Sequence, residues 1–121
     1  MATNRGYVKI YRKIRDSAVW HDPLKLRLWE ILLMKANHSK DYNFQSGTRK
    51  QIQRGELMTG RFSLAREYNE GLSKRYQRHP DTIWRWVNEF KKSGMIQVRS
   101  YSEYSVVTIT NWKKYQVDED E

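Results

Sequence analysis

The stretch His79–Gly94, HPDTIWRWVNEFKKSG, decides the fold, because it contains both ends and the buried face of one predicted helix. Pro80 suits the first helical position, where its missing N–H is no loss, and Asp81 places a carboxylate at the positive end of the helix dipole. Two lysines fall in the last turn, and Gly94 is typical of the residue just beyond a helix end. We therefore predict a helix that begins at Pro80 and ends just before Gly94.

This predicted helix has one apolar face and one polar face. Its apolar side chains recur at spacings of three and four residues, which is the period of an α-helix. They are Ile83, Trp86, Val87 and Phe90. The positions that face away from the core are Asp81, Trp84, Arg85, Asn88 and Lys92. Arg and Asn on the exposed side of a helix are residue types that read base edges in a DNA major groove, so this face is a candidate for base contact.

Length and composition restrict the class of protein. A chain of 121 residues is long enough for one domain with its own core, without help from a metal or disulfides. The absence of cysteine excludes disulfides, thiol catalysis and sulfur-ligated zinc sites. No apolar run is long enough to cross a bilayer, and no signal-peptide pattern opens the sequence. We therefore expect a soluble protein of the cytoplasm.

The sequence is strongly basic. It has 23 lysines and arginines against 14 acidic residues, and four of the acids form the run Asp118–Glu121, so residues 1–117 carry a net charge of +13. A domain this basic is expected to attract polyanions, with nucleic acid ahead of an anionic membrane. The alternative is that the charge only provides solubility. We predict a single DNA-binding domain over residues 1–117 and a disordered acidic tail over residues 118–121.

An arm and a helix are predicted in the first third of the chain. Apolar and basic side chains partly alternate in Tyr7–Ile14, which fits either a short strand or an extended arm that leads into a helical turn over residues 14–20. Asp22 and Pro23 resemble a cap and a first helical residue, and this helix continues to about Asn37. Because the helix is apolar on more than one side, it either lies in the core or offers a second face to a partner, including a second copy of the chain.

The middle of the chain contains two extended segments. Tyr42 and Phe44 are expected to begin a strand, and a turn is expected at Gly47. The second extended segment is Gln51–Thr59, which Gly55 interrupts.

A short helix is predicted next, over Gly60–Glu70, with Thr59 as its N-cap and Gly71 as its stop. Its buried side chains are expected to be Phe62, Leu64, Ala65 and Tyr68. The basic segment Leu72–Arg78 joins this helix to the one that begins at Pro80.

Two strands and a final turn of helix complete the pattern. Met95–Arg99 and Ser105–Thr110 are rich in β-branched residues, and the link between them is short enough for a hairpin. Asn111–Tyr115 is expected to form a helical turn that packs Trp112 back on the domain. The order of helix, strand, helix, turn, helix and hairpin predicts an α+β, mainly helical fold: a winged helix-turn-helix with three core helices and a C-terminal β-hairpin wing.

Three blocks of the sequence resemble the winged-helix N-terminal domains of phage replication initiation proteins, the replisome organisers of Gram-positive hosts, which are related to the primosomal DnaD family. The blocks are Gly6–Ile14 with Val19–Trp20 and Asp22–Pro23; Leu28–Leu33 with Lys35–His38 and Gly55–Arg61; and Thr82–Phe90 with Gly94–Ile96 and Val107–Gln116. Together they cover nearly the whole chain. Members of that family continue into a further C-terminal segment, so this sequence is either a fragment of a longer protein or a small protein of its own.

The resemblance implies binding of double-stranded DNA during replication initiation at a phage or prophage origin, in the cytoplasm or nucleoid of the host bacterium. It also implies contact with other replication proteins, and in the DnaD branch the equivalent domain self-associates, so a homodimer stays open. One alternative is a transcriptional repressor of the same fold, because fold does not determine function. Another is a protein-interaction or oligomerisation module of the replisome.

The candidate DNA contacts fall into three groups. For base contacts they are Thr82, Trp84, Arg85 and Asn88. For phosphate contacts they are Arg61, Lys74, Arg75, Arg78 and His79. For the wing they are Arg99 and Tyr101. The alternative for most of these positions is an ordinary solvated surface, and Trp84 could instead fold down and be largely buried.

Signals of catalysis and of metal binding are lacking in the sequence. His21, His38 and His79 are scattered, without the paired spacing of metal ligands. No phosphate-binding glycine loop and no arrangement of nucleophile and base is visible. We therefore predict that the protein is not an enzyme and that it has no cofactor and no metal site.

Overall fold

The computed structural model describes residues 6–38, 43–44 and 51–117, and within them the elements follow the predicted order. The helical elements are η2 (Arg12–Asp16), η3 (Ala18–His21), α1 (Pro23–Lys35), α2 (Arg61–Asn69), η4 (Lys74–Tyr76), α3 (Pro80–Lys92) and α4 (Trp112–Gln116). The strands are β1 (Asn43–Phe44), β2 (Gln51–Ile52), β3 (Glu56–Thr59), β4 (Ile96–Ser100) and β5 (Ser105–Ile109). The predictions for Tyr42, Gly47 and residues 118–121 lie outside the described residues.

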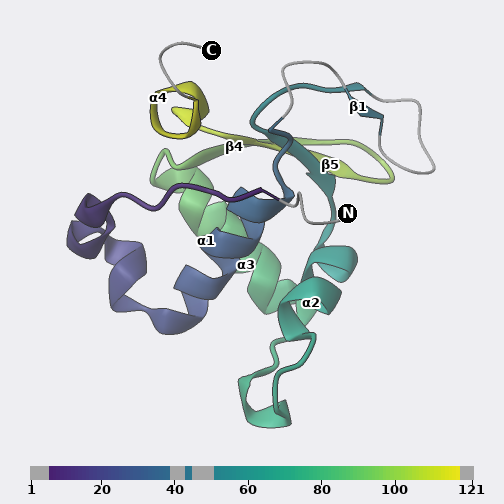
Figure 1. The fold of residues 1–121 in the computed structure, drawn as a ribbon. Helices are drawn as coiled ribbons and strands as arrows, with labels where there is room; N and C mark the ends of the chain where they lie inside the picture. Colours follow the sequence, from purple (N-terminus) through teal and green to yellow (C-terminus); the bar gives the residue numbers. More distant parts are fainter. Residues whose placement is uncertain (1–5, 39–42, 45–50, 118–121) are drawn as a thin grey trace.

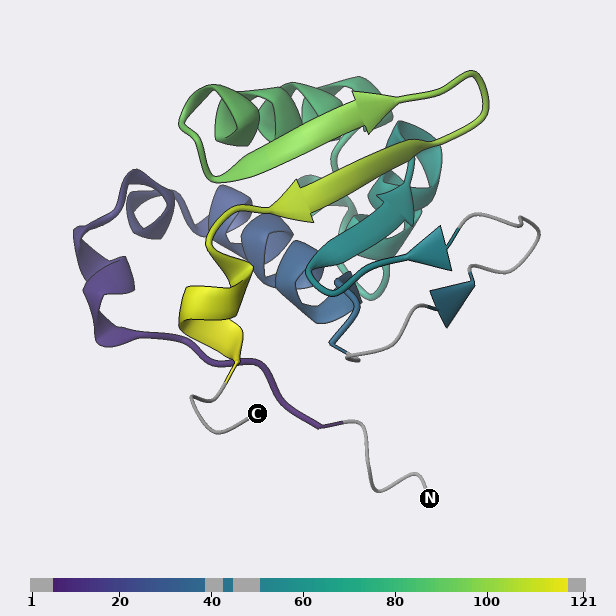
Figure 2. The ribbon, with the colours of Figure 1, turned by 90° about the horizontal axis from the view of Figure 1, so that it is seen from above.

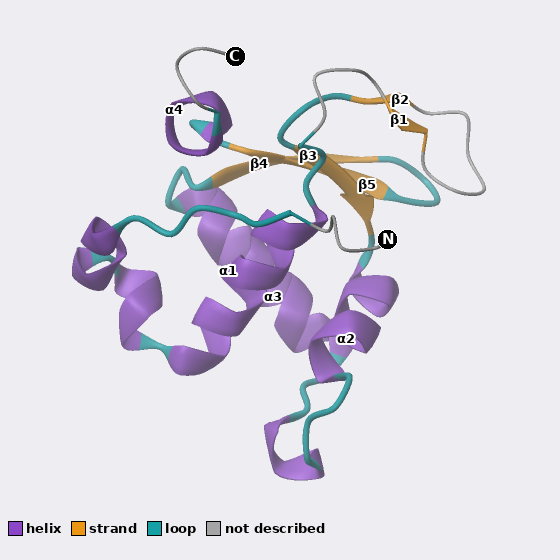
Figure 3. Cartoon of the chain, in the orientation of Figure 1, coloured by secondary structure: helices purple, strands orange, loops and turns teal. Residues whose placement is uncertain are grey.

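α1, α2 and α3 form one layer of the molecule and an antiparallel sheet forms the other (Figures 1 and 3). The sheet has three strands in the order β3-β5-β4, which lie side by side in Figure 2. β5 pairs with β4 as the predicted hairpin, with Ser100 opposite Ser105, and it pairs on its other edge with β3, where Glu56 lies opposite Thr108. This is a small α+β domain, consistent with a winged-helix-like arrangement.

α3 has the bounds that its sequence predicts. All four of its predicted core residues are buried. Pro80 is the first helical residue, and Gly94 adopts φ +81°, a conformation that glycine reaches without strain. His79 is the N-cap, because its Nδ1 accepts a hydrogen bond from the backbone N–H of Asp81 at 3.0 Å. The local signals of helix start, stop and period were therefore sufficient for this element.

α1 packs across α3 in the core. Asp22 caps it through hydrogen bonds that its Oδ1 accepts from the backbone N–H groups of Leu24 and Lys25, at 3.1 and 3.2 Å. The ring of Trp29 meets the ring of Phe90 edge to face, with centroids 5.8 Å apart. Leu28, Leu32 and Leu33 are buried, which confirms the core role of this helix. It ends at Lys35, two residues before the predicted end.

Two predictions for α2 are wrong. Thr59 is not its N-cap, because β3 continues through Thr59 and the cap position falls on Gly60. Phe62 is not in the core, since 65% of it is exposed. Successive residues of a helix lie about 100° apart, so Phe62 is turned about 200° away from the buried Leu64. The other three predicted core residues of α2 are buried.

The N-terminal segment is an extended arm followed by two short 3₁₀ turns, which agrees with the second of its two predicted forms. The backbone N–H of Lys9 donates to Oε1 of Gln116, and Nε2 of Gln116 donates back to the Lys9 carbonyl, both at 2.9 Å. These bonds hold the arm beside α4 (Figures 1 and 2). Trp112 of α4 is buried as predicted, against Gly55 of the turn between β2 and β3. No described helix has both the length and the apolar character that a membrane-spanning helix needs.

Candidate nucleic-acid interface

The outer face of α3 is slightly hollowed. The hollow has a volume of about 520 Å³ and is lined by Arg61, Asp81, Trp84, Arg85, Asn88, Glu89 and Lys92. Arg85 and Asn88 are both exposed, while the neighbouring Ile83, Trp86 and Val87 are buried on the inner face. The core therefore holds the helix in place while these two polar side chains remain available to a ligand.

The sequence left two alternatives for Trp84, an exposed side chain that can contact a ligand or a side chain folded against the core, and the structure shows features of both. It is half-buried and packs against the hydrophobic core, and it also lines the hollow beside Arg85 and Asn88. Its ring is thus supported from below and accessible from one side. Thr82 is half-buried in the first turn and is not among the residues that line the hollow.

Charge on this face is mixed. Nη1 of Arg61, on α2, lies 3.2 Å from Oδ1 of Asp81, on α3. Both side chains are more than half exposed, so this ion pair contributes only about 0–1 kcal/mol and a phosphate could replace the carboxylate. Nζ of Lys25 lies 2.5 Å from Oε1 of Glu89 at the other edge of the face.

The loop between α2 and α3 is clamped at its base by Asn69. Nδ2 of Asn69 donates to the backbone carbonyl of Arg78, and Oδ1 accepts from the backbone N–H of Arg78, both at 2.8 Å. This pair of bonds sets where the chain turns into α3. We missed Asn69 in the sequence, because no periodicity marks a partner nine residues away.

The predicted phosphate contacts of this loop differ in their surroundings. Lys74 and Arg75 are exposed on η4, at the end of the loop that projects beyond α2 in Figure 1. Nη1 of Arg78 donates to the carbonyls of Arg75 and Gln77, at 3.0 and 2.8 Å, so part of this guanidinium shapes the loop. His79 uses Nδ1 to cap α3.

The hairpin residues are also engaged within the domain. Nη2 of Arg99 lies 2.9 Å from Oε2 of Glu56, whose side chain is only 14% exposed. The rings of Tyr101 and Tyr104 stack with centroids 4.9 Å apart, and the turn closes through a 2.8 Å bond from the Tyr101 N–H to the Tyr104 carbonyl. Glu56 is a partner for Arg99 that we did not foresee, because 43 residues separate the two.

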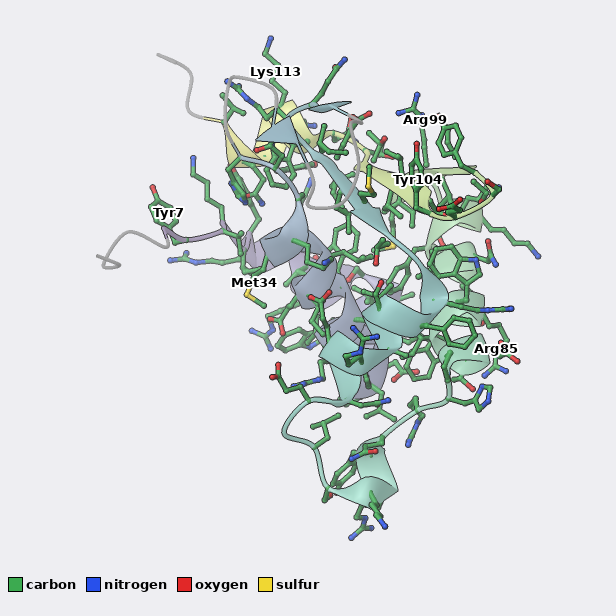
Figure 4. The ribbon with its side chains drawn as sticks, turned by 90° about the vertical axis from the view of Figure 1, so that its right-hand side faces the viewer. Tyr7, Met34, Arg85, Arg99, Tyr104 and Lys113 are labelled. Atoms are coloured by element: carbon green, nitrogen blue, oxygen red, sulfur yellow. The ribbon has the colours of Figure 1, made fainter. Side chains whose placement is uncertain are left out.

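α3 and the hairpin share one side of the molecule, and the loop that carries η4 projects from one end of it (Figures 1 and 4). Figure 4 shows Arg85, Arg99 and Tyr104 on that side and Tyr7 and Met34 on the opposite side. In the same view α3 lies between the hairpin and the loop that carries η4. Of the predicted contact residues, Arg61, Trp84, Arg85 and Asn88 line the hollow on α3, and Arg85 lies on the same side of the molecule as Arg99 of the hairpin.

No family model, no curated protein and no solved structure matches this chain. Within residues 6–38, 43–44 and 51–117, no three side chains of His, Cys, Asp or Glu are placed so that they could hold a metal ion. The described residues define a small α+β domain with a helix face that offers Arg, Asn and Trp side chains to a ligand.

Proposed function

We propose that this chain is a winged-helix protein that binds double-stranded DNA, with α3 in the major groove and the β4–β5 hairpin as the wing. One observation carries the proposal: Arg85 and Asn88 stand exposed on the outer face of a helix whose inner face is fully packed. Arg can hold guanine and Asn can hold adenine through paired hydrogen bonds. Residues on such a helix keep their spacing when they enter a groove.

Exposed cations on the elements that precede and follow α3 support the same orientation. Lys74 and Arg75 are exposed on η4, in the loop that leads into α3, and Arg99 is exposed on β4 of the hairpin that follows α3. Arg61 lines the hollow and forms a weak ion pair that binding can open. The helix would supply sequence preference, and the flanking cations would supply most of the affinity.

A role in phage-type replication initiation extends this proposal. It rests on the resemblance of the three sequence blocks to replisome organiser domains, and it includes contact with other replication proteins. The bound DNA separates this role from repression: sites clustered in an origin support replication, whereas sites that overlap promoters support a repressor of the same fold.

Selection of bound sequences from random duplexes, followed by anisotropy titrations at several salt concentrations, tests DNA binding directly. We expect an enriched sequence motif. Five cationic phosphate contacts (Arg61, Lys74, Arg75, Arg78 and Arg99) predict a slope of log affinity against log salt of about −4.5. The absence of duplex binding at about 50 mM salt would falsify the proposal.

A further inference from the structure

The N-terminal arm, η2, η3 and α4 lie on the side of the molecule away from α3 (Figure 2). Their side chains form a second basic surface, which we call the arm surface. Residues 6–21 and 111–117 contain a single carboxylate, Asp16. Their cations are Lys9, Arg12, Lys13, Arg15, Lys113 and Lys114. Five of these six, all except Lys9, are exposed, and none of the five forms an ion pair with a carboxylate among the described residues.

Two of these cations meet at one tyrosine ring. Nζ of Lys13 lies 4.4 Å from the ring centroid of Tyr115 and donates a hydrogen bond to its hydroxyl oxygen, while Nζ of Lys114 lies 5.2 Å from the same centroid. The hydrogen bond from Lys13, together with the positive charges of Lys13 and Lys114, holds the pKa of the Tyr115 phenol below its usual value of 10.0, although some desolvation opposes this. The potential at this point favours an anion.

An aromatic groove runs beside these charges. It has a volume of about 430 Å³, and the arm, α1, the end of β5 and α4 line it. Four aromatic residues contribute to its walls: Tyr11, Trp29, Trp112 and Tyr115. Tyr11 is 45% exposed and meets Tyr115 edge to face at 5.1 Å. A volume of this size falls within the range of sites for small molecules, whose walls are mostly apolar and aromatic.

We propose that the arm surface binds single-stranded nucleic acid, with a base in the aromatic groove and the adjacent phosphates on Lys13, Lys114 and their neighbours. Rings and cations side by side match the two parts of a nucleotide, the base and the phosphate. A single strand can turn a base into the groove, whereas a duplex keeps its bases stacked and offers only their edges. Within residues 6–21 and 111–117 six cations face one carboxylate, which favours a polyanion over a basic partner, and the acidic run Asp118–Glu121 follows these residues in the sequence.

Paired charge reversals separate this surface from the α3 face. Lys13→Glu with Lys114→Glu is compared with Lys74→Glu with Arg75→Glu, which changes the net charge equally. The probes are a fluorescent oligothymidylate of about 12 nucleotides, its oligouridylate counterpart and a duplex. We expect the first pair to weaken single-strand binding about tenfold or more and duplex binding by about twofold or less, and the second pair to do the reverse.

Because Lys13 contacts Tyr115, its replacement removes a contact within the fold, and a second variant is needed that does not. Arg12→Glu with Lys113→Glu removes two exposed cations of the same surface that take part in none of the described side-chain hydrogen bonds or ion pairs. It should weaken single-strand binding in the same direction, with an unchanged circular dichroism spectrum. Equal losses for single strand and duplex in either arm-surface variant would overturn the proposal.

A matched pair of tyrosine variants tests whether a base enters the aromatic groove. Tyr11 and Tyr76 are 45% and 44% exposed, but only Tyr11 lines the groove. Tyr11→Ala should weaken single-strand binding about fivefold or more, and Tyr76→Ala should leave it unchanged. An abasic oligonucleotide should bind about fivefold more weakly than oligothymidylate. Equal binding of the two would show that the groove does not hold a base.

The other possible outcomes of these experiments also support or overturn the proposal. If the arm-surface variants alter the oligomeric state in light scattering but not the affinity for a single strand, the surface is a protein contact and the proposal fails. Binding of the DNA or the RNA oligonucleotide supports it and identifies the kind of strand. A chain that binds single strands but no duplex keeps this inference and removes the proposed function, so the two can fail separately.

Discussion

The outer face of α3 and the arm surface both carry exposed cations, but they are built in different ways. α3 is one continuous helix, and its outer residues keep a fixed spacing because its inner residues are buried. The arm surface joins two ends of the chain, through the bonds between Lys9 and Gln116, which are 107 residues apart. One face can be recognised from a dozen consecutive residues, whereas the other exists only after folding.

The two regions also differ in how their charges are balanced. On the α3 face Arg61 pairs with Asp81 and Lys25 pairs with Glu89, so acids lie among the cations. The five exposed cations of the arm surface have no carboxylate partner among the described residues, and two lysines share the ring of Tyr115. Mixed charge with fixed spacing suits selective contact, and unbalanced charge beside rings suits contact that depends little on sequence.

The largest expected effect comes from the buried side of α3. Trp86 is 7% exposed and meets Tyr68 edge to face at 6.1 Å, so Trp86→Ala should lower the free energy of unfolding by about 3–5 kcal/mol. Trp84→Ala, at a half-buried position, should cost only about 1–2 kcal/mol. Urea denaturation followed by circular dichroism measures both. Similar losses would mean that α3 does not have distinct inner and outer sides.

Gly55 supports α4, and through it the arm surface. A Cβ at Gly55 would lie 2.8 Å from Cγ of Trp112, and φ there is +82°. Gly55→Ala should therefore cost about 2–4 kcal/mol, from backbone strain and overpacking together.

Gly94 is the matched control for Gly55, because its φ is +81° and a Cβ would meet nothing within 4 Å. Gly94→Ala should cost only the backbone strain, about 1–2 kcal/mol. Thermal or urea unfolding compares the two variants. An equal loss for both would show that contact with Trp112 does not matter.

Alanine variants of Arg85 and Lys74 distinguish sequence-specific base contact from non-specific attraction to phosphates in the binding of duplex DNA. Arg85→Ala should weaken binding to the selected duplex by about 1–3 kcal/mol and binding to random duplex by much less. Lys74→Ala should weaken both to a similar, smaller extent and make the salt slope shallower by about one. Parallel anisotropy titrations measure this. A uniform loss for Arg85→Ala would remove it as a base-reading residue.

The smallest expected effect is on the pKa values of Tyr115 and Tyr68. The hydrogen bond from Lys13 lowers the pKa of Tyr115, and burial raises the pKa of Tyr68, whose hydroxyl donates to the Leu24 carbonyl at 2.8 Å. Tyr115 should therefore ionise first on raising the pH, and Lys13→Met should move its pKa up towards 10.0. NMR titration of the tyrosine ring carbons follows both, with Lys91→Met as the control.

These shifts have opposite consequences for stability. The folded-state pKa of Tyr115 is depressed, so its contribution is present above the unfolded value near 10 and is lost as the pH falls through the folded value. The folded-state pKa of Tyr68 is raised, so its contribution is present below about 10 and is lost as the pH rises through the folded value. If Tyr68 ionised before Tyr115, at least one of the two structural explanations would be wrong.

Sequence predicted the parts of the fold that depend on neighbours along the chain. Pro80, Gly94 and the 3.6-residue period define α3 to within a residue, and Asp22 with Pro23 defines the start of α1. Phe62 was misplaced because apolar character alone does not say which side of a short helix meets the core. The pairing of β3 with β5 was not predicted, because no local signal chooses between strand partners about fifty residues apart.

The candidate site also has parts that the sequence predicts and parts that only the tertiary structure determines. That Arg85 and Asn88 lie on the outer face of a helix follows from period and composition, because both positions avoid the apolar stripe. The sequence by itself thus determined three helices, a hairpin and a basic, cysteine-free domain, since each rests on contacts between near neighbours or on composition. Only the tertiary structure decided that Glu56 holds Arg99, that Asn69 sets the start of α3 and that the arm meets α4. Those contacts join residues brought together by burial of the common core, and no spacing along the chain encodes them.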